Sequence, residues 1–164
     1  MSFSVSNKPP KEWLLDELRA HALVIGEVTL SSGQKASYYV DAKRALLRPA
    51  GFRACGMEVT IAAAELGADA VGGMSIGADP VTCAALAYPD VRELAGFFVR
   101  KERKEHGLQR WIEGPELEPG TRCLIVEDVV TTGGSTVKAI EAAGGAPFRA
   151  LVTIDELYPE RPDR

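Results

Sequence analysis

The chain has 164 residues, of which 46% are hydrophobic and 26% charged, and its formal net charge is −4. This composition is typical of one globular domain and excludes an intrinsically disordered chain. The negative balance argues against a generally basic surface that binds nucleic acid. The sequence contains no run of about 18 apolar residues, which excludes a membrane-spanning segment.

The first ten residues contain no apolar signal core, so we expect a cytoplasmic protein. Cys55, Cys83 and Cys123 are odd in number and widely separated. This spacing indicates neither a disulfide framework nor a CxxC metal motif. Each cysteine lies among apolar residues, so we expect three buried, reduced thiols.

The first third of the chain predicts a small element that precedes the main body. Apolar residues at helical spacing predict a helix over 11–21, after Pro9 and Pro10. Alternating residues at 28–30 and 37–40, with a turn at 31–34 between them, predict an antiparallel pair of strands. A mostly apolar helix is then expected to begin at Pro49 and to end at Gly67.

The rest of the chain alternates apolar strands with helices. Strands are expected at 68–74, 94–99, 122–127 and 148–154, and helices after Asp79, as the capping residue, and over 135–143. Residues 100–119 are expected to form a long loop with one hairpin. The order predicts an α/β domain with a central, mostly parallel sheet flanked by helices. Loops after Met74, Val99 and Glu127 should then converge on a ligand site.

Two acids and a glycine turn follow the strand predicted at 122–127. Glu127 and Asp128 end the strand, and the turn 131–135 is rich in threonine, serine and glycine. Backbone N–H groups of such a turn and a helix N-terminus bind phosphate. The turn lacks both the P-loop lysine and the GxGxxG pattern, which argues against a nucleoside triphosphate or a dinucleotide. Carboxylates bind sugar hydroxyls directly or through a divalent cation.

Together the acids and the turn predict a site for ribose 5-phosphate. The alternative is a strand-to-helix turn whose hydroxyls only cap the following helix.

Residues 100–107 are locally basic in an acidic chain, with four Lys or Arg and two Glu. A solvated surface of mixed charge is one interpretation. A nucleic-acid patch is another, although no aromatic residues interleave with these charges. The functional interpretation is a lid that brings cations to a pyrophosphate leaving group and keeps water from a cationic sugar.

These motifs resemble the type I phosphoribosyltransferases, whose signature is an apolar strand, two acids and a Thr-Gly-x-Ser/Thr turn. Arg100, Lys101, Lys104, His106 and Gly107 match the lid of the orotate phosphoribosyltransferases and narrow the resemblance to that family. Residues 30–41 are similar to its amino-terminal motif Ser-Gly-x-x-[Ser]-x-Tyr-[Tyr/Phe]. Residues 72–80 are similar to its pyrophosphate loop.

The resemblance implies a type I phosphoribosyltransferase fold over 1–164, with a small N-terminal hood at about 1–45 and a core at about 46–164. It implies transfer of the phosphoribosyl group of phosphoribosyl pyrophosphate (PRPP) to orotate. The products are orotidine 5′-phosphate and pyrophosphate, in pyrimidine biosynthesis. Mg²⁺ is the implied cofactor, and a homodimer that shares the basic loop between subunits is the implied assembly.

The resemblance also assigns site residues. Lys104 and Asp128 are the implied catalytic residues, with Lys104 as the general acid at the leaving oxygen. Thr131 and Tyr39 would contact orotate. The PRPP-binding residues would be Arg100, Lys101, Lys104, His106, Glu127, Asp128, Val129, Val130, Thr131, Thr132, Gly133, Gly134 and Ser135.

The sequence departs from the family in three places. Some members carry lysines at the positions of Ser31 and Gly77. The family also has a strand ending in Asp-Arg, whose arginine pairs with the orotate carboxylate, whereas the strand predicted at 148–154 is followed by Asp155 and Glu156. Either Glu156 replaces the arginine, or the Asp-Arg strand is absent and 148–154 is the family's final strand. We favour the second alignment, which leaves a sheet edge exposed or paired with a compensating partner.

These departures leave two alternative functions open. The chain could transfer the phosphoribosyl group to another base, or it could be a PRPP-binding regulator without catalytic activity.

Overall fold

The computed structural model describes residues 7–29, 35–102, 111–130 and 132–143, and the backbone of 151–153. Of the predicted site residues, Lys104, His106 and Thr131 lie outside these ranges. Asp155 and Glu156, which distinguish the two alignments, also lie outside them.

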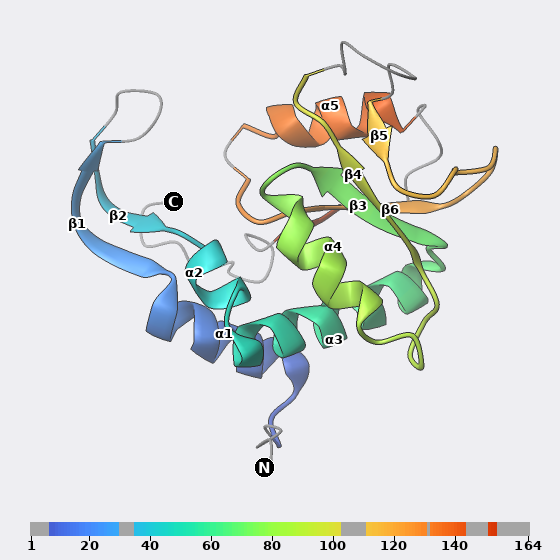
Figure 1. The fold of residues 1–164 in the computed structure, drawn as a ribbon. Coiled ribbons are helices and arrows are strands. Elements are labelled where there is room, and N and C mark those ends of the chain that lie inside the picture. Colours follow the sequence, from blue (N-terminus) through green and yellow to red (C-terminus); the bar gives the residue numbers. More distant parts are fainter. Residues whose placement is uncertain (1–6, 30–34, 103–110, 131, 144–150, 154–164) are drawn as a thin grey trace.

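The centre of the molecule is a five-stranded sheet with the order β5-β4-β3-β6-β7 (Figure 1). Strands β3 (Ala70–Met74), β4 (Ala95–Val99), β6 (Cys123–Glu127) and β7 (Leu151–Thr153) are parallel, and β5 (Ile112–Glu113) pairs antiparallel with β4. Every residue of β3 and β6 is buried, because helices cover both faces of a parallel sheet. The predicted α/β fold with a mostly parallel sheet is therefore confirmed.

Alternate residues of β6 enter two separate cores. Leu124 and Val126 pack with helices α1 (Pro10–His21), α2 (Lys43–Leu46), α3 (Pro49–Leu66) and α4 (Ala78–Leu86). Cys123 and Ile125 pack on the other face, with Phe97 and with Ala139 of α5 (Gly134–Ala142). This two-sided packing follows from the period of two in a strand. None of the helices in the described part of the chain is long and apolar enough to cross a membrane.

A hairpin of β1 (Leu23–Thr29) and β2 (Lys35–Val40) forms a separate two-stranded antiparallel sheet and projects from the body of the molecule (Figure 1). Its register changes between Ile25 and Val28. The Asp41 backbone N–H donates to the Ala22 carbonyl at 2.9 Å and closes the base of the hairpin. The antiparallel pair expected from the sequence is confirmed, and α2, which no pattern predicted, follows it.

The strand β7 pairs directly with the outer edge of β6, with Ile125 opposite Leu151 and Glu127 opposite Thr153. The edge of β6 is therefore paired with β7, whichever of the two alignments holds.

Two local predictions are wrong. Asp79 does not cap α4, because the chain is already helical at Gly77 (φ −61°, ψ −49°), which is the N-cap. The Asp79 carboxylate instead accepts a hydrogen bond from Ser75 Oγ at 2.8 Å. Cys83 is exposed, whereas Cys55 and Cys123 are buried, because Cys83 lies on the outer side of α4 while Val81 and Ala84 fill the core. The predicted bounds of α3 are confirmed, with Pro49 first and Gly67 (φ 65°) after the last turn.

Candidate active site

The two acids lie buried at the carboxyl edge of the sheet. Glu127 is the last residue of β6 and Asp128 follows it, and their exposed fractions are 8% and 6%. Strands β3 and β4 end in register at Met74 and Val99, so the loops that follow them leave from the same edge. Ligands of parallel sheets bind at this edge.

The loop after β3 lies against both acids at Gly77. A Cβ atom built on Gly77 would lie 2.4 Å from Asp128 Oδ1 and 2.9 Å from Glu127 Oε1. A side chain at this position would have to displace the acids, since real Cβ atoms essentially never lie within 3.0 Å of another group. The glycine therefore allows the loop backbone to cover the acid pair, and the lysine that some family members carry there could not be accommodated without moving the acids.

Burial and mutual repulsion raise the pKa of Glu127 to about 7. Desolvation is the main cause and the charge of Asp128 the second, while Lys101 and Lys43 act in the opposite direction. Lys101 follows β4, so the loops after β3, β4 and β6 meet at the acid pair, as the sequence predicted. Near neutral pH Glu127 therefore gains or loses its proton, and the net charge of the site changes with it.

Lys43 of α2 is a third charged group of the site, and no sequence motif points to it. Its Nζ donates to Asp128 Oδ2 at 2.5 Å, across 85 positions of sequence. Burial lowers the pKa of Lys43, but the hydrogen bond and the charge of Asp128, with smaller contributions from Asp41 and Tyr39, raise it above its ordinary value. No local signal marks this contact, because α2 has only four residues and no measurable periodicity.

Tyr39 lies on β2 with its side chain half-exposed. It is close enough to Lys43 to affect the pKa of that lysine. Lys43 is thus affected by both Tyr39, the predicted orotate contact on the hairpin, and Asp128, a predicted PRPP contact. Thr131, the second predicted orotate contact, lies outside the described residues.

The turn before α5 presents backbone and hydroxyl groups to solvent. Thr132, Gly134 and Ser135 are exposed, and Gly133 has a left-handed backbone (φ 75°) that favours glycine. Within the described residues no side chain caps α5, which argues against the alternative that these hydroxyls serve only as caps. The N–H groups at the start of α5 therefore remain available for an anion.

Two valines lie between the acid pair and the glycine turn, and at least one of them packs on the core. Val129 packs against the main core cluster, and Val129 and Val130 are both partly buried. This packing gives the acid pair and the glycine turn a common support.

The basic segment begins with two cations that have different neighbours. Arg100 Nη1 donates to Glu113 Oε1 at 3.1 Å, and the Arg100 backbone N–H donates to the Trp111 carbonyl at 2.9 Å, so Arg100 contacts the β5 segment. Lys101 is exposed and acts on Glu127. The structure thus brings Lys101, and not Arg100, toward the acids.

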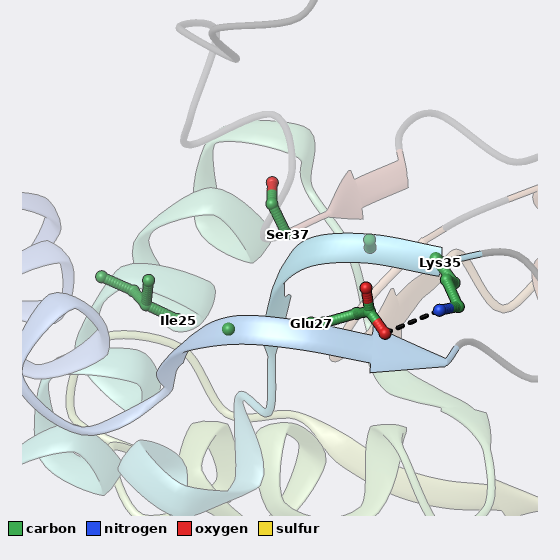
Figure 2. Close-up of a pocket in the computed structure, with 6 residues that line it drawn as sticks. Ile25, Glu27, Lys35 and Ser37 are labelled. Carbon is green, nitrogen blue, oxygen red and sulfur yellow. Dashed lines mark hydrogen bonds and ion pairs between the residues drawn. The ribbon is translucent and has the colours of Figure 1, made fainter.

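A hollow of about 340 Å³ lies on the hairpin and is separate from the acid pair (Figure 2). Its walls include Ile25, Ser37 and the exposed ion pair between Lys35 Nζ and Glu27 Oε1, which are 2.7 Å apart. The hollow contains neither acid nor any residue of the glycine turn, so we do not assign the reaction to it.

Within the described part of the chain, no group of three His, Cys, Asp or Glu side chains could hold a metal ion by itself. Mg²⁺ commonly binds through one or two carboxylates together with substrate phosphates and water. The two carboxylates of the acid pair are too few to bind Mg²⁺ by themselves. They fit an ion whose other ligands are substrate phosphates and water.

Known proteins share this fold and much of this sequence. No protein-family model matches the chain. The orotate phosphoribosyltransferase of Corynebacterium glutamicum is 46% identical over 142 residues, which cover 87% of this chain and 76% of the relative. The crystal structure of Mycobacterium tuberculosis orotate phosphoribosyltransferase with Fe(III) dicitrate matches with a TM-score of 0.77 and 39% identity, over 89% of this chain and 83% of that one.

The same mycobacterial enzyme has also been solved in complex with PRPP. That structure matches with a TM-score of 0.72 and 34% identity, over 89% of this chain and 82% of the other. The mostly parallel sheet flanked by helices is that of the type I phosphoribosyltransferase fold. The chain belongs to the orotate phosphoribosyltransferase family.

Proposed function

We propose that the chain transfers the phosphoribosyl group of PRPP to orotate and releases pyrophosphate. The observation that carries the proposal is the buried pair Glu127–Asp128 at the end of β6, followed directly by an exposed, uncapped glycine turn. The acids suit the ribose hydroxyls and the turn suits the 5-phosphate. The relatives named orotate phosphoribosyltransferase, one of them solved with PRPP, support this substrate pair.

In the reaction, the bond from the anomeric carbon to pyrophosphate breaks and a bond to an orotate nitrogen forms. That nitrogen loses its proton, which balances the proton taken up by the leaving pyrophosphate. Asp128 and Glu127 hold the two ribose hydroxyls, while the N–H groups of the turn and of α5 hold the 5-phosphate. With both ends of the sugar held, the anomeric carbon is oriented between the leaving group and the base. Both acids are buried, and the backbone at Gly77 lies against their carboxylates, which limits their movement.

The leaving pyrophosphate gains negative charge as the bond breaks, and cations of the basic segment stabilise it. Lys101 lies near enough to Glu127 for its charge to lower the pKa of that acid. Arg100 can exchange its half-exposed contact with Glu113 for the pyrophosphate, since such exposed ion pairs contribute at most about 1 kcal/mol. Lys104, which lies outside the described residues, is proposed to donate the proton to the leaving oxygen, and His106 to bind the pyrophosphate with it.

Glu127 and Asp128 would help to hold a Mg²⁺ ion that binds together with PRPP, and such an ion would supply positive charge to the pyrophosphate. We further propose a homodimer in which the basic segment of one subunit completes the site of the other. The cytoplasmic location expected from the sequence remains a prediction.

The direct experiment is an assay of the purified chain with PRPP, orotate and Mg²⁺, with pyrophosphate release as the readout. Orotidine 5′-phosphate should form, and hypoxanthine should not replace orotate. Activity with hypoxanthine but not orotate would contradict the proposed acceptor. PRPP binding without turnover on any base would favour the regulator, which the absence of an arginine after Asp155 also favours.

A binding experiment tests the role of the acids. Asp128→Asn should weaken PRPP binding by at least tenfold in calorimetry, because hydrogen bonds from ribose hydroxyls to a carboxylate are charge-assisted. Asp16→Asn is the matched control, since Asp16 also pairs with a lysine, Lys8, but lies exposed on α1. Equal PRPP affinity of the wild-type and Asp128→Asn chains would remove Asp128 from the PRPP site.

A further inference from the structure

Within the part of the chain that the structure describes, Lys43 is the cation in direct contact with the acid pair. The proposed reaction assigns it no role. Its Nζ lies 2.5 Å from Asp128 Oδ2, and its side chain is 38% exposed while that of Asp128 is 8% exposed. The ion pair therefore lies at the boundary between the core and the open side of the site.

The placement of Lys43 is built into the fold. Its helix α2 is anchored by Ala45 and Leu46, which are both buried. The backbone N–H of Arg44 donates to the carbonyl of Asp41 at 3.0 Å and fixes the start of the helix. Lys43 is thus presented to Asp128 from a rigid turn that joins the hairpin to the core.

The geometry divides the two carboxylate oxygens of Asp128 between different neighbours. Oδ2 accepts the hydrogen bond from Lys43, whereas Oδ1 faces Gly77, where a Cβ would lie only 2.4 Å away. A cation on the side chain of residue 77 has no room. Among the residues that the structure describes, the cation in contact with Asp128 comes from α2. Lys43 holds the carboxylate in one orientation, with Oδ1 directed to the side of the Gly77 loop.

The charge of Lys43 also matters for an anionic substrate. PRPP carries a phosphate and a pyrophosphate, and two adjacent buried carboxylates repel such a polyanion. Burial and the neighbouring Asp128 already disfavour the ionised form of Glu127, and the Lys43 ammonium offsets the charge of Asp128. The acid pair can then accept hydrogen bonds from hydroxyls without a large net negative charge.

We propose that Lys43 is a positioning residue for PRPP, which acts through Asp128 by orienting its carboxylate and offsetting its charge. The inference rests on the proposed function, since it concerns the same substrate. It adds to the site a residue from α2, the short helix between the hairpin and the core.

The test is PRPP binding by calorimetry with the full chain and Mg²⁺. Lys43→Met keeps most of the length of the side chain and removes its charge, and should raise the Kd for PRPP about tenfold, or about 1.4 kcal/mol. Lys43→Arg keeps the charge and should recover most of the affinity. Lys8→Met removes another lysine that pairs with an aspartate, on the exposed face of α1, and should leave the Kd unchanged.

A double-mutant cycle distinguishes action through Asp128 from direct contact with the substrate. In an Asp128→Asn background, Lys43→Met should change the Kd by less than about twofold. Additive losses would overturn the proposal, because Lys43 would then act on PRPP independently. An unchanged Kd in Lys43→Met, with a wild-type melting temperature, would overturn it as well, as would failure of Lys43→Arg to recover affinity.

Steady-state kinetics add a readout that a purely structural role would not produce. Lys43→Met should raise the KM for PRPP and leave the KM for orotate within about twofold. If Lys43→Met does not fold, Lys43→Gln replaces it in the same cycle. If the wild-type chain itself does not bind PRPP, the proposed function fails, whereas wild-type binding with an unaffected Lys43→Met variant contradicts this inference alone.

Discussion

Replacing Gly77 by alanine is the sharpest test of how the loop after β3 supports the acid pair. The backbone at Gly77 is helical, with φ −61° and ψ −49°, so alanine introduces no backbone strain. The added Cβ would meet Asp128 Oδ1 at 2.4 Å and Glu127 Oε1 at 2.9 Å. Gly77→Ala therefore changes the positions of two carboxylates and little else.

The size of the effect follows from the overlap. Ordinary van der Waals contact begins at 3.4 Å, so the Asp128 carboxylate or the loop must move by about 1 Å. A misplacement of about 1 Å at a reacting site can cost roughly 100-fold in rate. Overpacking of a well-filled site costs about 1–3 kcal/mol of folding free energy. We expect kcat/KM for PRPP to fall about 100-fold in a protein that still folds.

The assay is pyrophosphate release at varied PRPP, together with a urea melt of each variant. Gly96→Ala is the matched control, because its Cβ would meet Leu86 Cδ1 at 2.5 Å, the mobile end of a side chain that is 40% exposed. The control should lose some stability and keep its KM for PRPP. Wild-type kcat/KM in Gly77→Ala would refute the argument that the acids need the space left by glycine.

Three further predictions follow from the charged groups. Lys104→Ala should lower kcat far more than PRPP affinity, and an unchanged kcat would remove Lys104 from the chemistry. The pKa of Glu127 is raised to about 7 from an ordinary 4.5, so the folded state holds this proton more tightly than the unfolded state does. The contribution of Glu127 to the unfolding free energy therefore falls by about 2–3 kcal/mol as pH rises from about 4.5 to 7. Glu127→Gln should abolish that part of the pH dependence in urea melts at pH 5 and pH 8, and an unchanged slope would contradict the assignment. Hydrogen bonds from Arg122 lower the pKa of Asp69 to about 2 from 3.8, so Asp69 stabilises the fold above its unfolded pKa and loses this effect as pH falls toward 2. Asp69→Asn should therefore be less stable than wild type at pH 7 and equally stable near pH 2, and equal stability at both pH values would show that the Arg122 contact adds nothing.

Several features could be predicted because their signals are local. The strand that ends at Glu127 is a short apolar run, and a helix that starts at Pro49 and stops before Gly67 has both boundary residues in the sequence. The glycine turn follows the acids directly along the chain, so their proximity needed no tertiary information. The family resemblance depends on the same contiguous motifs.

Other features depend on contacts between distant residues. Lys43 and Asp128 lie 85 positions apart, and the helix that carries Lys43 is too short to leave a periodic pattern. Asp79 looks like a cap in the sequence, but the chain enters the helix at Gly77 and leaves Asp79 inside the first turn.

The sequence by itself determined the order of the strands and of the helices other than α2, the acid pair and the turn that follows it, since each depends on neighbouring residues. Only the tertiary structure decided which groups surround the acids: Gly77 against their oxygens, Lys43 on Asp128, and a pKa of about 7 at Glu127. The physical reason is that burial and electrostatic interaction depend on distances in space, which separation along the chain does not specify.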